Sequence, residues 1–288
     1  MAATAVTGPR GGVPRGRDPG RPAPGRPVQA LAAVAGVLLG LPVLVLIVRA
    51  VSDGSLVTAL GMGVVVDALS LSLITTSASL VLMIVLGTPL AFVLARRRFR
   101  GQWLLEAVID LPIVLPPSVA GLALLLVFGR RGLLGPTLEV FGITLPFTTV
   151  AVVIAQTFVA APFFIRSART GFAMVDHDLE DAARVDGASE RQLFAWITIP
   201  LASTALTAGL VMSWARALGE FGATIMFAGN LERRTQTLPL VVYSEFQTGN
   251  LDTSVAAAAI LVLAAFGVLI AVRLMHWGRV LDVRGVGG

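Results

Sequence analysis

The long apolar runs of this chain constrain its fold more than any other feature. About 20 consecutive apolar residues in a helix cross the hydrocarbon core of a bilayer. The composition agrees, because 56% of the residues are hydrophobic and only 14% are charged, whereas soluble domains average about a quarter charged residues. The sequence therefore predicts an all-α membrane protein with about six spans, at Leu31–Val48, Ala68–Ala95, Leu104–Phe128, Phe147–Ala168, Leu201–Phe227 and Val255–Leu274.

Arginines predict the orientation of these spans, because cytosolic segments of membrane proteins carry the excess of positive charge. With the N-terminus inside, the inner segments hold most of them, and the outer segments hold Arg49, Arg130, Arg131, Arg233 and Arg234. We expect the protein to lie in the cytoplasmic (inner) membrane. Both termini and segment 169–200 are expected on its cytosolic side. The net charge of +5 is explained by this topology and not by nucleic-acid binding.

Three segments are expected along the chain. Residues 1–29 are rich in Arg, Gly and Pro and predict a disordered cytoplasmic tail. The run after it ends at Arg49 without a small-residue cleavage site, which favours an uncleaved first span. A transmembrane domain is expected over residues 30–277, and a short cytoplasmic tail over 278–288.

Residue types restrict the chemistry of the chain. There is no Cys, and the two histidines, His177 and His276, are far apart, so neither a thiol nucleophile nor a metal cluster is expected. The chain has no Lys, which excludes the phosphate-binding loop Gly-x-x-x-x-Gly-Lys-Ser/Thr. ATP would therefore have to be bound by another subunit.

Prolines interrupt several spans, most densely at Pro112, Pro116 and Pro117. A proline removes a backbone donor and clashes with the preceding turn. Two interpretations stay open here: ordinary proline of a membrane helix, or a kinked helix that lines a cavity.

Segment 169–200 has the pattern of a docking element. Asp176 and Asp178 favour a helix start, Gly187 breaks the helix, and a second helical piece leads to Pro200. Small residues allow close approach of a partner, and a charged rim is expected from Glu180, Asp181, Arg184 and Asp186. The alternative is a solvated helix that only joins two spans.

The spacing in this segment is specific. Asp181-Ala182-Ala183 is followed after three residues by Gly187, and after nine more by Ile197-Thr198-Ile199-Pro200. It resembles the cytoplasmic EAA loop of permease subunits of bacterial ABC importers, with Asp181 in place of Glu and Ile199 in place of Leu. The resemblance implies that the loop inserts a coupling helix into an ATPase subunit, and that contact is made by Glu180, Asp181, Ala182, Ala183, Gly187, Ala188, Ile197 and Pro200.

Other segments narrow the resemblance. Several segments look like the corresponding parts of the molybdate permease family: Ser213–Asn230, Arg234–Leu240, and Leu115–Pro117 with Gly121–Gly132. The likeness covers about residues 65–275. Sulfate and thiosulfate permeases are close relatives of that family and remain the alternative, as does a preference for tungstate.

Arg216 and Glu220 are charges at membrane depth, where such residues are costly and usually face a bundle interior or a cavity. Their spacing puts them on one helix face. Either Arg216 attracts an oxyanion, or the two residues neutralise each other and fix the helix. We group them with Gly219, Thr224, Pro116 and Pro117 as candidates for the translocation path or an intramembrane charge pair.

The family resemblance implies the remaining partners. Two copies of the chain would enclose the path, two ATP-binding subunits would bind ATP and Mg²⁺, and an extracytoplasmic molybdate-binding protein would deliver the cargo. Membrane lipid surrounds the spans, and no cofactor is expected in this chain. An intramembrane enzyme is a remote alternative, because the spans offer no Ser/His or Asp/Asp pair and no catalytic residue is expected.

Overall fold

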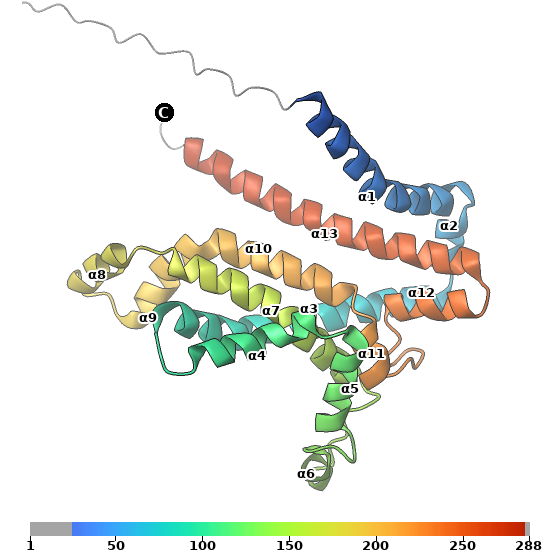
Figure 1. The fold of residues 1–288 in the computed structure, drawn as a ribbon, viewed down its shortest axis with the longest axis horizontal. Coiled ribbons are helices and arrows are strands. Elements are labelled where there is room, and N and C mark those ends of the chain that lie inside the picture. The colour runs from blue at the N-terminus through green and yellow to red at the C-terminus, as the bar shows by residue number, and fades with distance from the viewer. Residues whose placement is uncertain (1–24, 286–288) are drawn as a thin grey trace, which may run out of the picture. The chain divides into compact units, whose positions relative to one another are not determined.

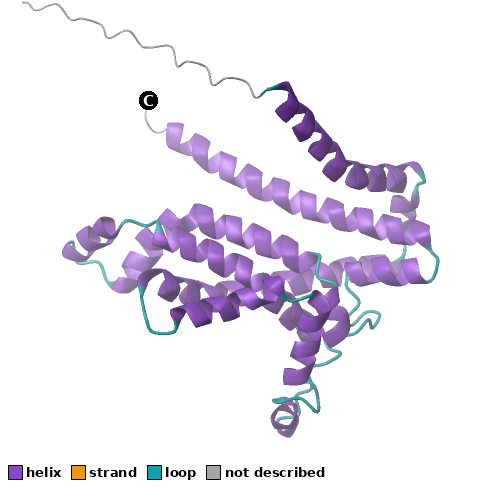
Figure 2. Cartoon of the chain, in the orientation of Figure 1, coloured by secondary structure: helices purple, strands orange, loops and turns teal. Residues whose placement is uncertain are grey.

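The computed structural model describes residues 25–285, and within this range every regular element is a helix (Figure 2). Residues up to Val45 form one unit and residues from Leu46 onward form a second. The first unit is most of α1 (Arg26–Ser52), and the second contains all the other helices. The expected all-α architecture is confirmed.

Five helical stretches are long and apolar enough to cross a membrane, among the residues described. They are α1, α3 (Gly63–Arg96), α7 (Thr149–Ala173), the stretch Glu190–Leu218, and Leu251–Ile270 at the start of α13 (Leu251–Gly285). A sixth is counted if α4 (Gln102–Val114) and α5 (Pro117–Phe128) together make one span.

The third expected span is not one continuous helix, because α4 and α5 meet at a bend of 120°. Pro116 and Pro117 cause this break. Leu115 takes an extended conformation, as residues before proline prefer, and Pro117 begins α5 in the first turn, where a missing N–H is tolerated. Pro112, by contrast, stays inside α4. The structure shows the kink of the second interpretation, and that the kinked helix lines a cavity stays a prediction.

The fifth expected span is also shorter than predicted. α10 (Ile199–Leu218) ends before Gly219, and a separate short helix, α11 (Gly222–Phe227), follows. The Glu220 side chain accepts a hydrogen bond from the Ala223 N–H at 2.8 Å, so it caps the new helix. The sequence analysis did not predict α12 (Leu238–Gln247), nor the short helices α2 (Ser55–Leu60) and α6 (Gly135–Val140).

The first and last helices extend into the two segments that the sequence predicted to be tails. α1 begins at Arg26, within the segment 1–29 that was expected to be a disordered tail, and residues 1–24 lie outside the described range. The backbone of α13 stays helical through residues 278–285 of the expected C-terminal tail, and residues 286–288 lie outside the description.

The core of the second unit is the packing of α7 between α3 and α10 (Figure 1). Small residues let these helices approach closely, as in many membrane proteins. A Cβ on Gly171 would lie 2.7 Å from Ala205, and one on Gly209 would lie 2.7 Å from Ser167. The three helices therefore form a tightly packed scaffold.

Buried hydroxyl and amide groups join α3 to α7. Ser79 donates to the side-chain oxygen of Gln156 at 3.1 Å, and the Gln156 amide donates to Thr76 at 3.4 Å. Because no water reaches such groups within hydrocarbon, each needs a partner inside the protein. This network keeps α3 and α7 in one register.

Candidate functional site

Helix α8 (His177–Val185) stands at one end of the scaffold of α3, α7 and α10 (Figure 1). It starts as the sequence predicts, because the Asp176 side chain accepts the Asp178 N–H at 3.0 Å. It ends at Val185, and the turn after it contains Gly187, whose φ of +91° is one that residues with a side chain rarely adopt. A capping box of Ser189 and Gln192 then begins α9 (Glu190–Leu193).

The second helical piece is continuous with the following span. α9 leads through a π-helical turn, η1 (Phe194–Thr198), into α10, and Pro200 lies in the first turn of α10. Wide π turns occur mostly as single turns within α-helices. The loop between α7 and α10 is therefore one short helix, one glycine turn and an extension of a span.

Glu180 does not lie on the expected charged rim. It is only 3% exposed, and its Oε1 lies 2.6 Å from Nη2 of Arg96, at the end of α3. The hydroxyl of Thr198 donates to the same oxygen at 2.8 Å. A carboxylate is stable in such a place only with a charged partner and hydrogen bonds. Glu180 therefore fastens α8 to α3 and to the beginning of α10.

Four large apolar side chains are exposed in this region, among exposed charged residues such as Asp178, Asp181 and Arg184. Leu179 and Val185 on α8 are 51% and 88% exposed, and Trp196 is 74% exposed. Met174, just before α8, is also exposed. Glu180 is the exception among the acids of α8, because it is buried while Leu179 and Val185, which a surface helix normally buries, are exposed. We call Met174, Leu179, Val185 and Trp196 the docking surface, because they lie in or beside the segment that the sequence predicts to dock.

The other predicted docking residues lie around this surface. Ala182 is exposed, Ala183 is half-buried, and Pro200 is exposed at the base of α10. Gly187, Ala188 and Ile197 line a shallow pocket of about 260 Å³ together with Trp196. The structure thus brings the two halves of the motif together at one hollow.

Exposed ion pairs hold α8 to α9. Arg184 lies 2.8 Å from both Asp181 and Glu190. The hydrogen bond from Arg184 holds the pKa of Glu190 below its usual range. This carboxylate therefore stays ionised, and its link to Arg184 intact, at all pH values near neutral.

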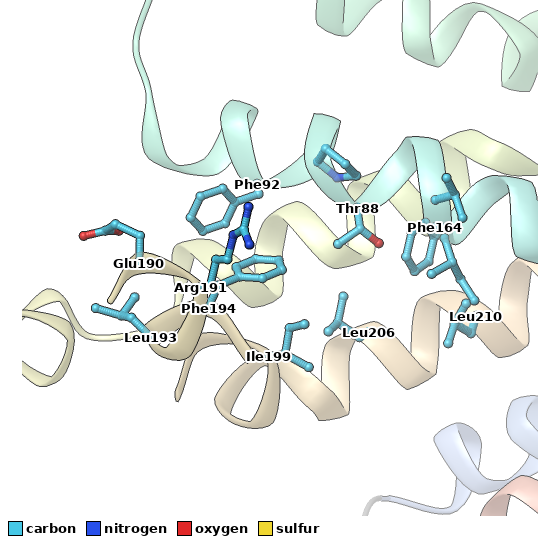
Figure 3. Close-up of a pocket in the computed structure, with 13 residues that line it drawn as sticks. Thr88, Phe92, Phe164, Glu190, Arg191, Leu193, Phe194, Ile199, Leu206 and Leu210 are labelled. Carbon is cyan, nitrogen blue, oxygen red and sulfur yellow. The ribbon is translucent and has the colours of Figure 1, made fainter. Parts of the chain in front are cut away.

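A large groove lies beneath the loop, between α3, α7 and the start of α10 (Figure 3). Its volume is about 670 Å³, and its walls are mainly apolar, with Phe92, Phe164 and Phe194 among them. Glu190 and Arg191 stand at one end. A divalent oxyanion needs charged or hydrogen-bonding groups, so the groove does not suit one.

Arg216 and Glu220 form an ion pair, as one of the two interpretations expected. Nη1 of Arg216 lies 2.6 Å from Oε2 of Glu220, whose side chain is 1% exposed, while that of Arg216 is partly exposed. Since Glu220 also caps α11, it holds the junction between α10 and α11. Its negative charge lies beside the cation that would otherwise attract an anion.

The two helix breaks lie against each other. A Cβ on Gly222 would lie 2.6 Å from Cβ of Pro117, and one on Gly121 would lie 2.6 Å from the carbonyl of Ala223. Thr224 is fully buried there, and its hydroxyl has no hydrogen-bond partner among the described residues. Pro117, Glu220 and Thr224 therefore belong to one region, whereas a Cβ on Gly219 would lie 3.7 Å from the carbonyl oxygen of Ala215, at an ordinary contact distance.

A sequence model of one family matches most of the chain. It describes the binding-protein-dependent transport system inner membrane component, and it covers residues 83–277. The chain belongs to this family. It is therefore a multi-pass membrane permease component, and the expected fold class and family resemblance are confirmed.

Similar proteins from bacteria agree with this membership. The molybdenum transport system permease protein ModB of Mycobacterium tuberculosis is 44% identical over 67% of this chain and 72% of its own length. ModB of Escherichia coli K12 is 41% identical over 60% of this chain and 76% of its own length. The sulfate transport system permease protein CysT of Escherichia coli K12 is 34% identical over 67% of this chain and 69% of its own length.

Solved structures support the fold. A bacterial ABC transporter involved in the import of the acidic polysaccharide alginate matches with a TM-score of 0.70 at 16% identity, over 86% of this chain and 93% of that one. The MetNI methionine ABC transporter matches with a TM-score of 0.54 at 17% identity, over 73% of this chain and 92% of that one.

Two residues of this permease component were missed from sequence. Arg96 stands first in a cluster of arginines that we attributed to topology, and Thr198 lies between two isoleucines of the motif. The cluster gives no signal that separates Arg96 from its neighbours. Only the packing of α3 against the loop shows that Arg96 is the partner of Glu180.

Proposed function

We propose that two copies of this chain form the membrane path of an ATP-driven importer of molybdate, which also accepts tungstate. Two ATPase subunits bind ATP and Mg²⁺ on the cytosolic side, where the chain's termini and docking surface lie. An extracytoplasmic molybdate-binding protein delivers the anion on the other side. The names of the relatives at 41% to 44% identity support molybdate over sulfate, whose relative stands at 34%.

Exposed apolar side chains on α8 carry the proposal of a motor contact. Leu179 and Val185 are exposed while Glu180 is buried, so these two apolar side chains are left without cover by this chain. An ATPase subunit that receives α8 in a cleft would remove this surface from water, at a gain of about 25 cal/mol per Å² of apolar area.

The links of α8 to the spans support a route for transmission. Glu180 is bonded to Arg96 at the end of α3 and to Thr198 at the start of α10. Movement of α8 with the ATPase would therefore be passed to both spans. Pro117 and Gly222 are in close contact, where the break between α4 and α5 meets the break between α10 and α11. On this proposal, alternating access would change the path at this contact.

The charge pair of Arg216 and Glu220 fits a path that does not hold its cargo tightly. A dianion near Arg216 would also be repelled by the carboxylate of Glu220, which lies 2.6 Å from the guanidinium. Strong selection among oxyanions therefore belongs to the binding protein. On this proposal Arg216 and Glu220 are structural partners, not ligands.

Deletion of the gene tests the proposed substrate. Growth that depends on molybdenum enzymes should fail in the deletion strain at low external molybdate, and high external molybdate should restore it through weaker routes. A deletion strain that requires reduced sulfur while its molybdenum enzymes remain active would instead assign the chain to sulfate transport.

A further inference from the structure

A pocket that two arginines help to line lies at the start of α7, apart from the sites described above. Its volume is about 410 Å³, and it is lined by Leu125, Arg130, Thr144, Pro146, Phe147 and Arg234. Unlike the apolar groove between α3, α7 and the start of α10, it combines two guanidinium groups and a hydroxyl group.

The pocket lies at the end of the scaffold that is remote from the docking surface. α7 starts at Thr149, next to the pocket, and ends at Ala173, next to α8. A helix of 25 residues is about 37 Å long, which exceeds the thickness of the hydrocarbon core. The pocket and the docking surface therefore belong to opposite sides of the membrane.

Arg130 and Arg234 have free guanidinium groups. Neither group forms an ion pair or hydrogen bond with the described side chains. Two other arginines on this side are paired, Arg233 with Asp67 at 2.9 Å and Arg49 with Asp53 at 3.5 Å. The two cations that line the pocket are left without a carboxylate.

The backbone holds both arginines in place. Thr149 donates its hydroxyl hydrogen to the carbonyl of Arg234 at 2.8 Å. The loop after α5 is fixed by hydrogen bonds of 2.9 Å from the Leu133 N–H to Leu126 and of 2.8 Å from the Leu134 N–H to Val127. The pocket is therefore formed before any ligand arrives.

Phe147 supplies one wall in an unusual conformation. Its φ is +61°, which is a strained value for an aromatic residue. Its ring packs against Gly229, where a Cβ would lie 2.8 Å from the ring. Such conformations persist only where the surroundings enforce them, and they cluster at ligand sites.

We propose that this pocket receives a divalent tetrahedral oxyanion on its way from the binding protein into the path. The inference rests on the proposed function. Guanidinium groups donate pairs of parallel hydrogen bonds to oxyanions, and Thr144 adds a hydroxyl group. Because Arg130, Thr144 and Arg234 are exposed, water and salt screen the attraction, so the site holds the anion weakly and releases it.

Charge-selective labelling tests the pocket directly. The chain has no Cys, so Thr144→Cys introduces its single thiol. We expect an anionic methanethiosulfonate to modify this thiol faster than a cationic one, after correction for intrinsic reactivity, and molybdate or sulfate in the medium to slow the reaction. Adding Arg130→Gln and Arg234→Gln should abolish both effects. Equal rates for both reagents and no protection by either anion would overturn the proposal.

Uptake separates an anion site from a docking surface for the binding protein. In proteoliposomes of the full complex, Arg130→Gln with Arg234→Gln should lower the maximal uptake rate by about tenfold, which corresponds to about 1.4 kcal/mol for the two guanidinium groups together. The half-saturating concentration of the loaded binding protein should not change. Arg131→Gln, next to the pocket but not lining it, is the matched control.

Two outcomes would contradict the proposal that this pocket receives an oxyanion. In one, the double variant transports like the control. In the other, its half-saturating concentration of binding protein rises while the maximal rate is kept, which would make the arginines a docking surface for an acidic protein. If the unmodified complex takes up neither molybdate nor sulfate, the proposed function fails instead.

Discussion

At the scale of single residues, burial decides the role of each charge. Glu180 and Glu220 are the carboxylates that this chain buries almost completely within the described range, and each lies 2.6 Å from an arginine. Asp181, directly after Glu180, is exposed and pairs only with Arg184. Neighbouring acids of one motif therefore serve different purposes, and substitutions can separate them.

Removing the charge of Glu180 should weaken the joint between α8 and the spans. In Glu180→Gln the Arg96 guanidinium is left buried without its counter-ion, which costs about 3 kcal/mol or more. We expect a lower thermal stability of the purified complex and poorer coupling of ATP hydrolysis to uptake. Asp181→Asn is the matched control, and it should leave thermal stability unchanged. Equal effects of the two substitutions would show that Glu180 is not the joint.

The pair of Arg216 and Glu220 should behave as a structural unit. Arg216→Ala and Glu220→Ala each leave one charge unpaired at membrane depth, so each should lower assembly or thermal stability. The double change should recover part of the loss, because it leaves no unpaired charge. Thermal unfolding of all three variants measures this coupling. If Arg216→Ala abolishes transport and keeps full stability, Arg216 is an anion ligand.

At the scale of elements, apolar runs predicted most helices, and special residues decided where those helices break. The runs located α1, α3, α7, α10 and α13, since length and hydropathy are enough for that. The bend between α4 and α5 was indicated by Pro116 and Pro117, but its size was not. The end of α10 was missed, because the start of α11 depends on a side-chain cap in which Glu220 accepts the Ala223 N–H.

The turn after α8 should tolerate no bulk at the motor contact. In Gly187→Trp the indole would fill the hollow beside Ala188 and Trp196 and obstruct the ATPase. We expect the permease to insert in the membrane but to lose the ATPase subunit, or to hydrolyse ATP without uptake. Co-purification of the subunits and the ratio of hydrolysis to uptake measure both effects.

Gly142→Trp is the control for backbone strain. Gly142 also has a positive φ, +70°, and open space around its Cβ position, so a side chain there brings a similar conformational cost of about 1 kcal/mol. It lies in the loop before α7, away from α8. A Gly187→Trp complex that assembles and transports like Gly142→Trp would refute the docking role of this turn.

At the scale of the whole molecule, the scaffold of α3, α7 and α10 connects a docking surface at one end to a cationic pocket at the other. Sequence predicted the docking loop, because its spacing is local in the chain. It did not predict the pairing of Glu180 with Arg96, the contact of Pro117 with Gly222, or the joint lining of one pocket by Arg130 and Arg234. Each of these joins residues 80 or more positions apart, and only tertiary packing reveals such pairs.

Uptake of labelled oxyanion by the reconstituted complex tests the central claim most directly. Proteoliposomes would contain two copies of this chain with the cognate ATPase subunit, and the cognate binding protein would be supplied outside. We predict ATP-dependent accumulation of molybdate that excess unlabelled tungstate suppresses and excess sulfate does not. Accumulation of sulfate without molybdate, or accumulation of molybdate that needs neither ATP nor the binding protein, would contradict the account.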